Sequence, residues 1–187
     1  MIREALKTEN IICSILIKES AEMFLKFYFS DSFQDLLNQM IPLDKGIYSY
    51  KYILIDSDNK GCLLNYTLKN FNDEIFYTIK QIIKIKGLFP SIKYLLRSLK
   101  LTNLKLSTNE LYLSNISVFA EYRRNGIATM LIEKAEENAK AMKYKKMVLD
   151  VEPENKEAIR LYLKLGFKII YKYAIGKFPF YRMEKEL

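Results

Sequence analysis

The sequence predicts an α+β fold in which helices flank a mixed, mostly antiparallel sheet. Three patterns predict it: a strand-like run, a turn and an amphipathic helix over residues 111–142, a second strand and helix over 144–167, and hairpin patterns near both ends of the chain. The chain has 187 residues, of which 50% are apolar and 28% charged, a balance typical of globular proteins. We therefore expect a single domain over residues 1–187.

Short strands and helices are expected in the first third of the chain. Apolar residues at a spacing of three to four predict helices, and β-rich runs on either side of a polar turn predict a hairpin. The expected elements are a strand at 2–5, helices at 10–29 and 33–40, and a hairpin of strands 48–56 and 62–69.

Residues 72–109 are predicted to form a helical insertion before the central strand. Helical spacing occurs over 75–86 and 91–100, and Gly and Pro separate the two runs at 87–90. The segment is too short to bury a core of its own, so we expect it to pack across one end of the sheet. A stabilising appendage or a dimer contact is the alternative, and the chain is expected to be a monomer or a homodimer.

A phosphate-binding turn is predicted at Arg123-Arg124-Asn125-Gly126-Ile127-Ala128, between the apolar run 111–119 and an amphipathic helix. A turn that enters a helix presents several unpaired backbone N–H groups, and the helix dipole adds partial positive charge there. Gly126 leaves the backbone open, and the small Ala128 keeps the next turn open. A plain strand-turn-helix has the same local pattern.

The last part of the chain closes the fold. The expected elements are a strand at 146–151, a helix that begins after Asn155 and stops at Gly166, and a hairpin of strands 167–174 and 180–186. Cys13 and Cys62 lie in apolar surroundings without metal-ligand spacing and are expected to be buried free thiols. The chain has no histidine, so His-based triads and most zinc sites are excluded, and no metal site is expected.

The turn and the later segment 155–167 together resemble the acetyl-CoA-binding core of the GCN5-related N-acetyltransferase (GNAT) superfamily. Arg123, Gly126 and Ala128 fit the family pattern of Arg or Gln, two residues, Gly, one residue, and Gly or Ala. The resemblance is strong over residues 111–173 and weak before them. It implies a GNAT fold and an acyltransferase that uses acetyl-CoA as acyl donor.

The resemblance also implies a set of cofactor-binding residues. The strand before the turn would bond the pantetheine arm through its backbone, and the turn would hold the pyrophosphate. The residues concerned are Ile116, Ser117, Val118, Arg123, Arg124, Asn125, Gly126, Ile127, Ala128, Thr129 and Asn155. Core burial of Ile116 and Val118, and helix capping by Asn155, are compatible with these roles.

Catalytic residues are also implied. Tyr162 follows Asn155 by seven residues, where the superfamily often has a tyrosine that acts as general acid; a core tyrosine is the alternative. Without histidine, a base must be a carboxylate, a tyrosine or a relayed water. Asp150 resembles the glutamate at that place in the ribosomal-protein N-terminal acetyltransferases, and Glu110 at the start of the central strand is the second candidate. We prefer Asp150, with a relaying water.

Composition leaves the acceptor open. We expect a small-molecule or peptide amine. No apolar run approaches the roughly 20 residues of a membrane span, and the amino end lacks a signal pattern, so no membrane partner and a cytoplasmic protein are expected. The net charge of +8 has a local excess within 72–109, so a nucleic-acid-binding protein is one alternative, although we favour solvated lysines. The other alternative to an N-acetyltransferase is a non-catalytic protein that binds acetyl-CoA as a sensor.

Overall fold

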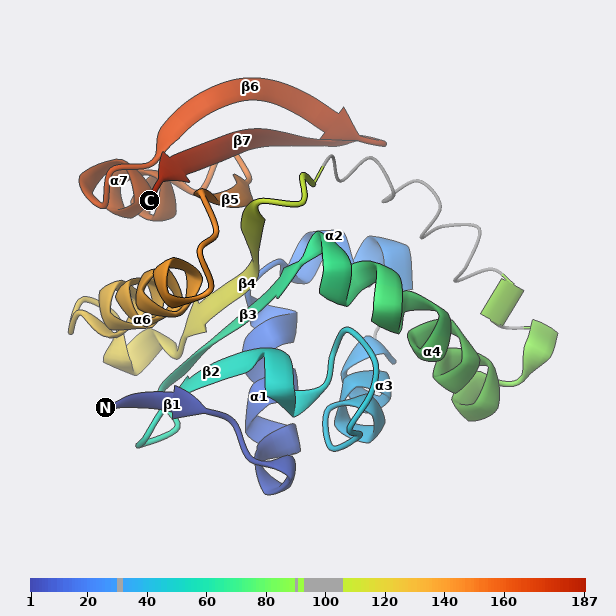
Figure 1. The fold of residues 1–187 in the computed structure, drawn as a ribbon. Helices are drawn as coiled ribbons and strands as arrows, with labels where there is room; N and C mark the ends of the chain where they lie inside the picture. Colours follow the sequence, from blue (N-terminus) through green and yellow to red (C-terminus); the bar gives the residue numbers. More distant parts are fainter. Residues whose placement is uncertain (30–31, 90, 93–105) are drawn as a thin grey trace.

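A computed structural model describes residues 1–29, 32–89, 91–92 and 106–187 (Figure 1). Within these residues, seven strands form one sheet in the order β1-β2-β3-β4-β5-β7-β6. The strands are β1 (Ile2–Glu4), β2 (Ile53–Asp56), β3 (Gly61–Thr67), β4 (Glu110–Val118), β5 (Lys146–Val151), β6 (Lys168–Ile175) and β7 (Phe178–Glu186). Neighbours are antiparallel except β4 and β5, which are parallel. The predicted mixed, mostly antiparallel sheet is confirmed.

Helices cover both faces of this sheet (Figure 1). One face packs against α1 (Asn10–Glu19), α2 (Glu22–Phe29) and α3 (Phe33–Met40), and the other against α6 (Ile127–Ala141) and α7 (Lys156–Lys164). Strand alternation divides the core accordingly, because Ile53 and Ile55 join the first layer while Leu54 joins the second. Cys13 and Cys62 are buried free thiols in the first layer, as predicted.

The predicted helix over residues 10–29 is wrong in its length, because the structure contains two helices there, α1 and α2. They are separated at Ser20 and Ala21. The Ser20 hydroxyl donates to the carbonyl of Ile17 at 2.7 Å and accepts from Asn115 Nδ2 at 2.7 Å. Side-chain bonds of this kind compete with the helical backbone, so α1 ends beside the central strand.

The predicted boundary between the second hairpin strand and the next helix is also wrong. β3 ends at Thr67, and α4 (Leu68–Lys86) begins at the next residue instead of at 75. A capping box explains the change, since Asn70 N donates to Thr67 Oγ1 and Thr67 N donates to Asn70 Oδ1, each at 3.1 Å.

The predicted strand at 48–56 is shortened to β2 by the 3₁₀ turn η2 (Tyr50–Tyr52). Of the helix predicted at 91–100, residues 93–100 lie outside the described residues.

The central strands separate partway along their length, and this positions the site. β4 and β5 pair only over residues 110–113 and 146–149. On its other side β4 stays paired with β3, with a register shift that leaves Ser114 as a bulge between Leu113 and Asn115. The β5-facing side of residues 114–118 therefore has no strand partner in the part of the chain that the structure describes.

Candidate active site

Two cavities adjoin at the separation of β4 and β5. One, of about 620 Å³, lies over the turn between β4 and α6; we call it the turn cavity. The other, of about 870 Å³, lies between α1, α2, α4 and the sheet; we call it the aromatic cavity. The residues that line both are Glu19, Ser20, Ile116, Asn155, Ala158 and Tyr162. Because the same side chains border both spaces, the cavities meet there.

The turn cavity contains the exposed amino end of α6. Gly126 is the N-cap residue, with φ of 78° and no side-chain cap bond. A Cβ at Gly126 would have no atom within 4 Å, so the space above the turn is open. Arg124 also has a positive φ, 67°, which is uncommon for a residue with a side chain. The uncapped N–H groups and the dipole of this 15-residue helix favour an anion in the cavity.

Two arginines border the turn. Arg123 Nε donates to the carbonyl of Val118 at 3.1 Å, which ties the turn to the end of β4. Arg124 Nη1 lies 3.3 Å from Glu157 Oε1 on α7, and both side chains are exposed. Of the predicted cofactor-binding residues, those that line the turn cavity are Ile116, Ser117, Val118, Arg123, Arg124, Gly126, Ile127, Ala128, Thr129 and Asn155. Asn125 is exposed and lines neither cavity.

The open side of β4 leads from the turn to the junction of the cavities. Ile116, Ser117 and Val118 pair with β3 on one side, and their other side faces the separation from β5. Backbone groups without a strand partner are strong hydrogen-bonding sites for an extended ligand that carries amides. Asn155 caps α7 by accepting from Ala158 N at 3.1 Å.

Tyr162 lies where the two cavities meet. Its side chain is buried, and burial raises the pKa of its hydroxyl well above the usual range. No described residue makes a hydrogen bond to this hydroxyl. The group is therefore protonated at neutral pH and available to donate to a ligand.

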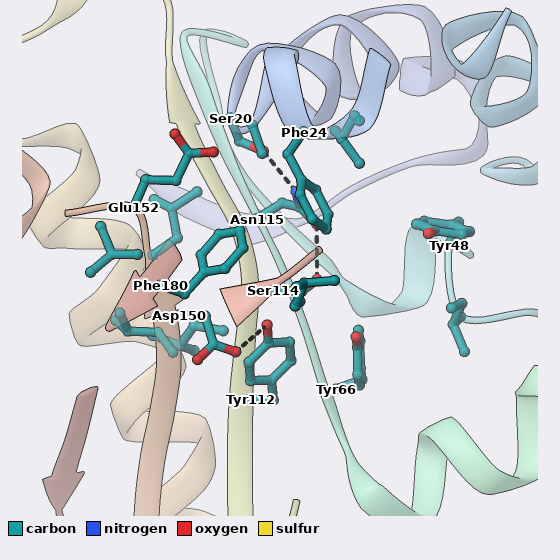
Figure 2. A pocket seen from close by; sticks show the side chains of 18 of the residues that line it. Ser20, Phe24, Tyr48, Tyr66, Tyr112, Ser114, Asn115, Asp150, Glu152 and Phe180 are labelled. Atoms are coloured by element: carbon teal, nitrogen blue, oxygen red, sulfur yellow. Dashed lines mark hydrogen bonds between the residues drawn. The ribbon is translucent and has the colours of Figure 1, made fainter. Parts of the chain in front are cut away.

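Asp150, at the end of β5, is held in a buried ion pair. Arg182 stands opposite it on β7 and donates from Nε and Nη2 to the two carboxylate oxygens at 2.8 and 3.0 Å. The Tyr112 hydroxyl donates to the same carboxylate at 3.1 Å (Figure 2), and the Asp150 and Arg182 side chains are 7% and 2% exposed. Glu110 lines neither cavity; its carboxylate accepts from Ser107 N at 2.8 Å.

Glu152 is a candidate that sequence reasoning missed. It is half-buried in the wall of the aromatic cavity, and Figure 2 shows its side chain without a hydrogen bond to the other residues drawn. Among the described residues, none donates a hydrogen bond to it. Burial raises its pKa, and repulsion from Glu154 adds to the shift. The signal in the sequence was its place two residues after Asp150, since alternate residues leaving a strand lie on one face.

Aromatic rings line the rest of this cavity. Phe180 contacts Phe24 and Tyr173 with ring centroids 5.3 and 6.0 Å apart, and Tyr66 contacts Tyr112 and Phe71 at 5.5 and 6.0 Å. The predicted insertion at 72–109 adds one wall, because four of its described residues, all on α4, belong to the lining. They are Ile75, Thr78, Ile79 and Ile82. Among the described lining residues, all the charged ones are acids: Glu19, Glu22, Asp150 and Glu152.

Part of the sequence and the whole fold are similar to those of known acetyltransferases. Residues 92–167 match the sequence model of the Acetyltransferase (GNAT) family. Three crystal structures are similar: an acetyltransferase (24% identity, TM-score 0.72, 100% of this chain and 98% of that one), an N-acetyltransferase from Staphylococcus aureus Mu50 (21%, 0.70, 98% and 99%), and the PaiA N-acetyltransferase from Thermoplasma acidophilum in complex with coenzyme A (15%, 0.59, 100% and 98%). No curated protein matches significantly. The predicted GNAT fold is confirmed.

Proposed function

We propose that the chain is an N-acetyltransferase of the GNAT family, which uses acetyl-CoA as its acyl donor and transfers the acetyl group directly to a primary amine held in the aromatic cavity. The observation that carries this proposal is the junction at Tyr162. There, an anion-binding turn cavity opens into a second cavity large enough for a small acceptor. Because both halves of the chain contribute to the two cavities, we also propose that residues 1–187 act as one domain.

The turn cavity fits the cofactor. Gly126 and the uncapped start of α6 would hold the pyrophosphate, with Arg123 and Arg124 supplying positive charge at the rim. The open side of β4 at residues 116–118 would bond the amides of the pantetheine arm. Bound in this way, acetyl-CoA supplies an activated acyl carbon at the junction of the cavities.

The proton transfers are assigned from the state of each side chain. Glu152 accepts a proton from the ammonium form of the acceptor, directly or through water, because its carboxylate is unpaired and its pKa is raised. The amine nitrogen would then bond to the acyl carbon as the carbon–sulfur bond breaks, and the nitrogen would release its second proton to water. Tyr162 would donate its hydroxyl proton to the departing sulfur and regain a proton from water. Asp150 was our preferred base from sequence, but its pairing with Arg182 favours a positioning role.

The test is Tyr162→Phe, which removes only the hydroxyl. We expect kcat to fall by roughly 10²–10⁴ while the affinity for CoA stays nearly constant, since only the transition state uses the proton. Steady-state assays with an amine panel, combined with calorimetry of CoA binding, measure both quantities. Tyr144→Phe, outside both cavities, is the control.

The same assays distinguish the transferase from the alternative, a non-catalytic sensor. A non-catalytic acetyl-CoA-binding protein would bind CoA but consume no acetyl-CoA with any amine. Full activity in Tyr162→Phe would instead leave the transferase function intact and remove Tyr162 as the acid.

A further inference from the structure

The aromatic cavity differs in charge from the molecule that surrounds it. The chain has a net charge of +8, yet the charged residues in the described lining are all acids. Asp150 is neutralised by Arg182, and Glu19 and Glu22 are exposed. Glu152 is the half-buried carboxylate without a described partner, so it creates a place for one positive charge.

Several polar groups of the wall are bonded within the protein. The Tyr112 hydroxyl donates to Asp150, Asn115 Nδ2 donates to Ser20, and the Thr78 hydroxyl donates to the carbonyl of Glu74. Glu19 and Glu22, the remaining acids of the described lining, are exposed, so a second ammonium deeper in the cavity would have no buried carboxylate left to pair with. Burying such groups without partners is costly.

The body of the ligand would instead meet rings and aliphatic side chains. Phe24 and Phe180 contact each other edge to face, Tyr66 and Tyr112 lie against each other on the sheet, and Figure 2 shows these rings around the open space. Rings in such contacts form surfaces that favour a further aromatic ring, and their faces attract an ammonium group. The cavity volume of about 870 Å³ is within the usual range of small-molecule sites, about 300–1,000 Å³.

We propose that the acceptor is a small monoamine with an aromatic body, its ammonium at Glu152 and its ring among the side chains of the aromatic cavity. This inference rests on the proposed N-acetyltransferase function. It predicts that polyamines and amino sugars are poorer acceptors, because an additional charge would have no buried counter-charge and additional hydroxyls would lie against rings and aliphatic side chains.

The test compares 2-phenylethylamine with propylamine, spermidine and glucosamine in acetyl-CoA-dependent assays of the full chain. We expect kcat/KM for 2-phenylethylamine to exceed the other values by roughly tenfold or more, on the scale of apolar pocket selectivity. A higher kcat/KM for spermidine or glucosamine would overturn the inference while supporting the transferase function. CoA binding without acetyl transfer to any amine would instead overturn the proposed function and the inference together.

A pair of variants on α4 tests where the ring binds. Ile79→Trp places bulk into the cavity wall, and Phe76→Trp places the same bulk at a position on the same helix that is 76% exposed and outside the lining. We expect Ile79→Trp to raise KM for 2-phenylethylamine roughly tenfold while changing KM for propylamine little, and Phe76→Trp to change neither. An equal effect of Ile79→Trp on both amines would count against the binding site. The comparison of amines in the unmodified protein needs no variant to fold.

Discussion

Glu152 has a combination of properties that none of the other described carboxylates near the junction has. It is half-buried, unpaired among the described residues, and its pKa is raised by burial and by Glu154. A carboxyl with a raised pKa is ionised only above that pKa, so a reaction that needs the carboxylate is present above it and lost as the pH falls through it. The acidic limb of kcat/KM should therefore lie above the ordinary range of a glutamate, about 4.3.

Glu152→Gln tests this assignment. We expect the acidic limb to disappear and kcat/KM to fall by roughly 10²–10⁴, the range of a lost general base. Since burial disfavours the ionised form in the folded state, Gln at this position should not lower stability at neutral pH, and thermal unfolding measures this. An unchanged pH profile in the variant would assign the base elsewhere.

Gly126 is central to the proposed cofactor site. Its φ of 78° is disfavoured for a β-branched residue, and a side chain there would point into the open space of the turn cavity. Gly126→Val should weaken CoA binding at least tenfold by calorimetry, through displaced charge-assisted bonds.

Gly166 is a matched control for the strain of that substitution. It has φ of 90° after α7, lies outside both cavities, and a Cβ there would approach only Lys185, at 3.7 Å. Gly166→Val should lose stability through the same backbone effect but keep its affinity for CoA. Equal CoA affinities in wild type and a folded Gly126→Val would contradict the proposed cofactor site.

At the scale of secondary-structure elements, the β5–β7 pair supports the floor of the aromatic cavity. Asp150 and Arg182 are directly opposite each other in this pair, and both are almost fully buried. Asp150→Asn would leave a buried guanidinium without its counter-charge, for which losses of about 3–5 kcal/mol are typical. Urea unfolding should show a loss of this size. Glu137→Gln, which breaks the exposed pair with Lys134, should change the midpoint little.

Activity separates positioning from direct catalysis at Asp150. If Asp150 positions Tyr112 and the cavity floor, Asp150→Asn should raise KM for the amine and keep the acidic limb that Glu152 determines. If a folded Asp150→Asn variant lost the acidic limb of its kcat/KM profile, the general base would be assigned to Asp150 and not to Glu152.

The elements that sequence predicted well are those with strong local signals. The turn at 123–128 and the helix after Asn155 have a glycine or a cap at a defined position, and both were placed correctly. The boundary at Thr67 was missed because the capping box uses Asn70 where Glu or Gln is usual. The break at Ser20 depends on Asn115, 95 residues away, and could not be read from local periodicity.

The site could be predicted only in part, because some of its contacts join residues that are far apart in the sequence. The proposed cofactor-binding residues other than Asn155 lie close together within 116–129, so a sequence pattern could suggest them. Arg182 is one of four charged residues in β7, and its role follows from the register that places it opposite Asp150. The aromatic cavity combines α1, α2, α4, α7 and five strands, so its lining requires the tertiary structure. Among the described residues, no helix is long and apolar enough to cross a membrane.

At the scale of the whole molecule, the chain has a net charge of +8, while the charged residues in the described lining of the aromatic cavity are acids. The local excess of positive charge within 72–109 includes Lys80, Lys84, Lys93 and Arg97, of which the last two lie outside the described residues. Lys80 and Lys84 are exposed on α4, whereas Ile79 and Ile82 of the same helix line the aromatic cavity. This is the arrangement of an amphipathic helix with its charges in water and its apolar face against the protein.

The double variant Lys80→Glu, Lys84→Glu decides between a solvated surface and a nucleic-acid site. We expect acetylation of 2-phenylethylamine to be unchanged and RNA binding to be weak at physiological salt in both proteins, because these lysines lie away from the cavity. If the surface instead bound RNA, the affinity would fall with salt at a log–log slope of about −0.7 to −0.9 per phosphate contacted, and the double variant would flatten that slope. Filter binding of RNA over a salt series measures it. A steep slope in the wild type that flattens in the variant would reject the solvated surface, since charges that contact no phosphate cannot change the number of released counterions.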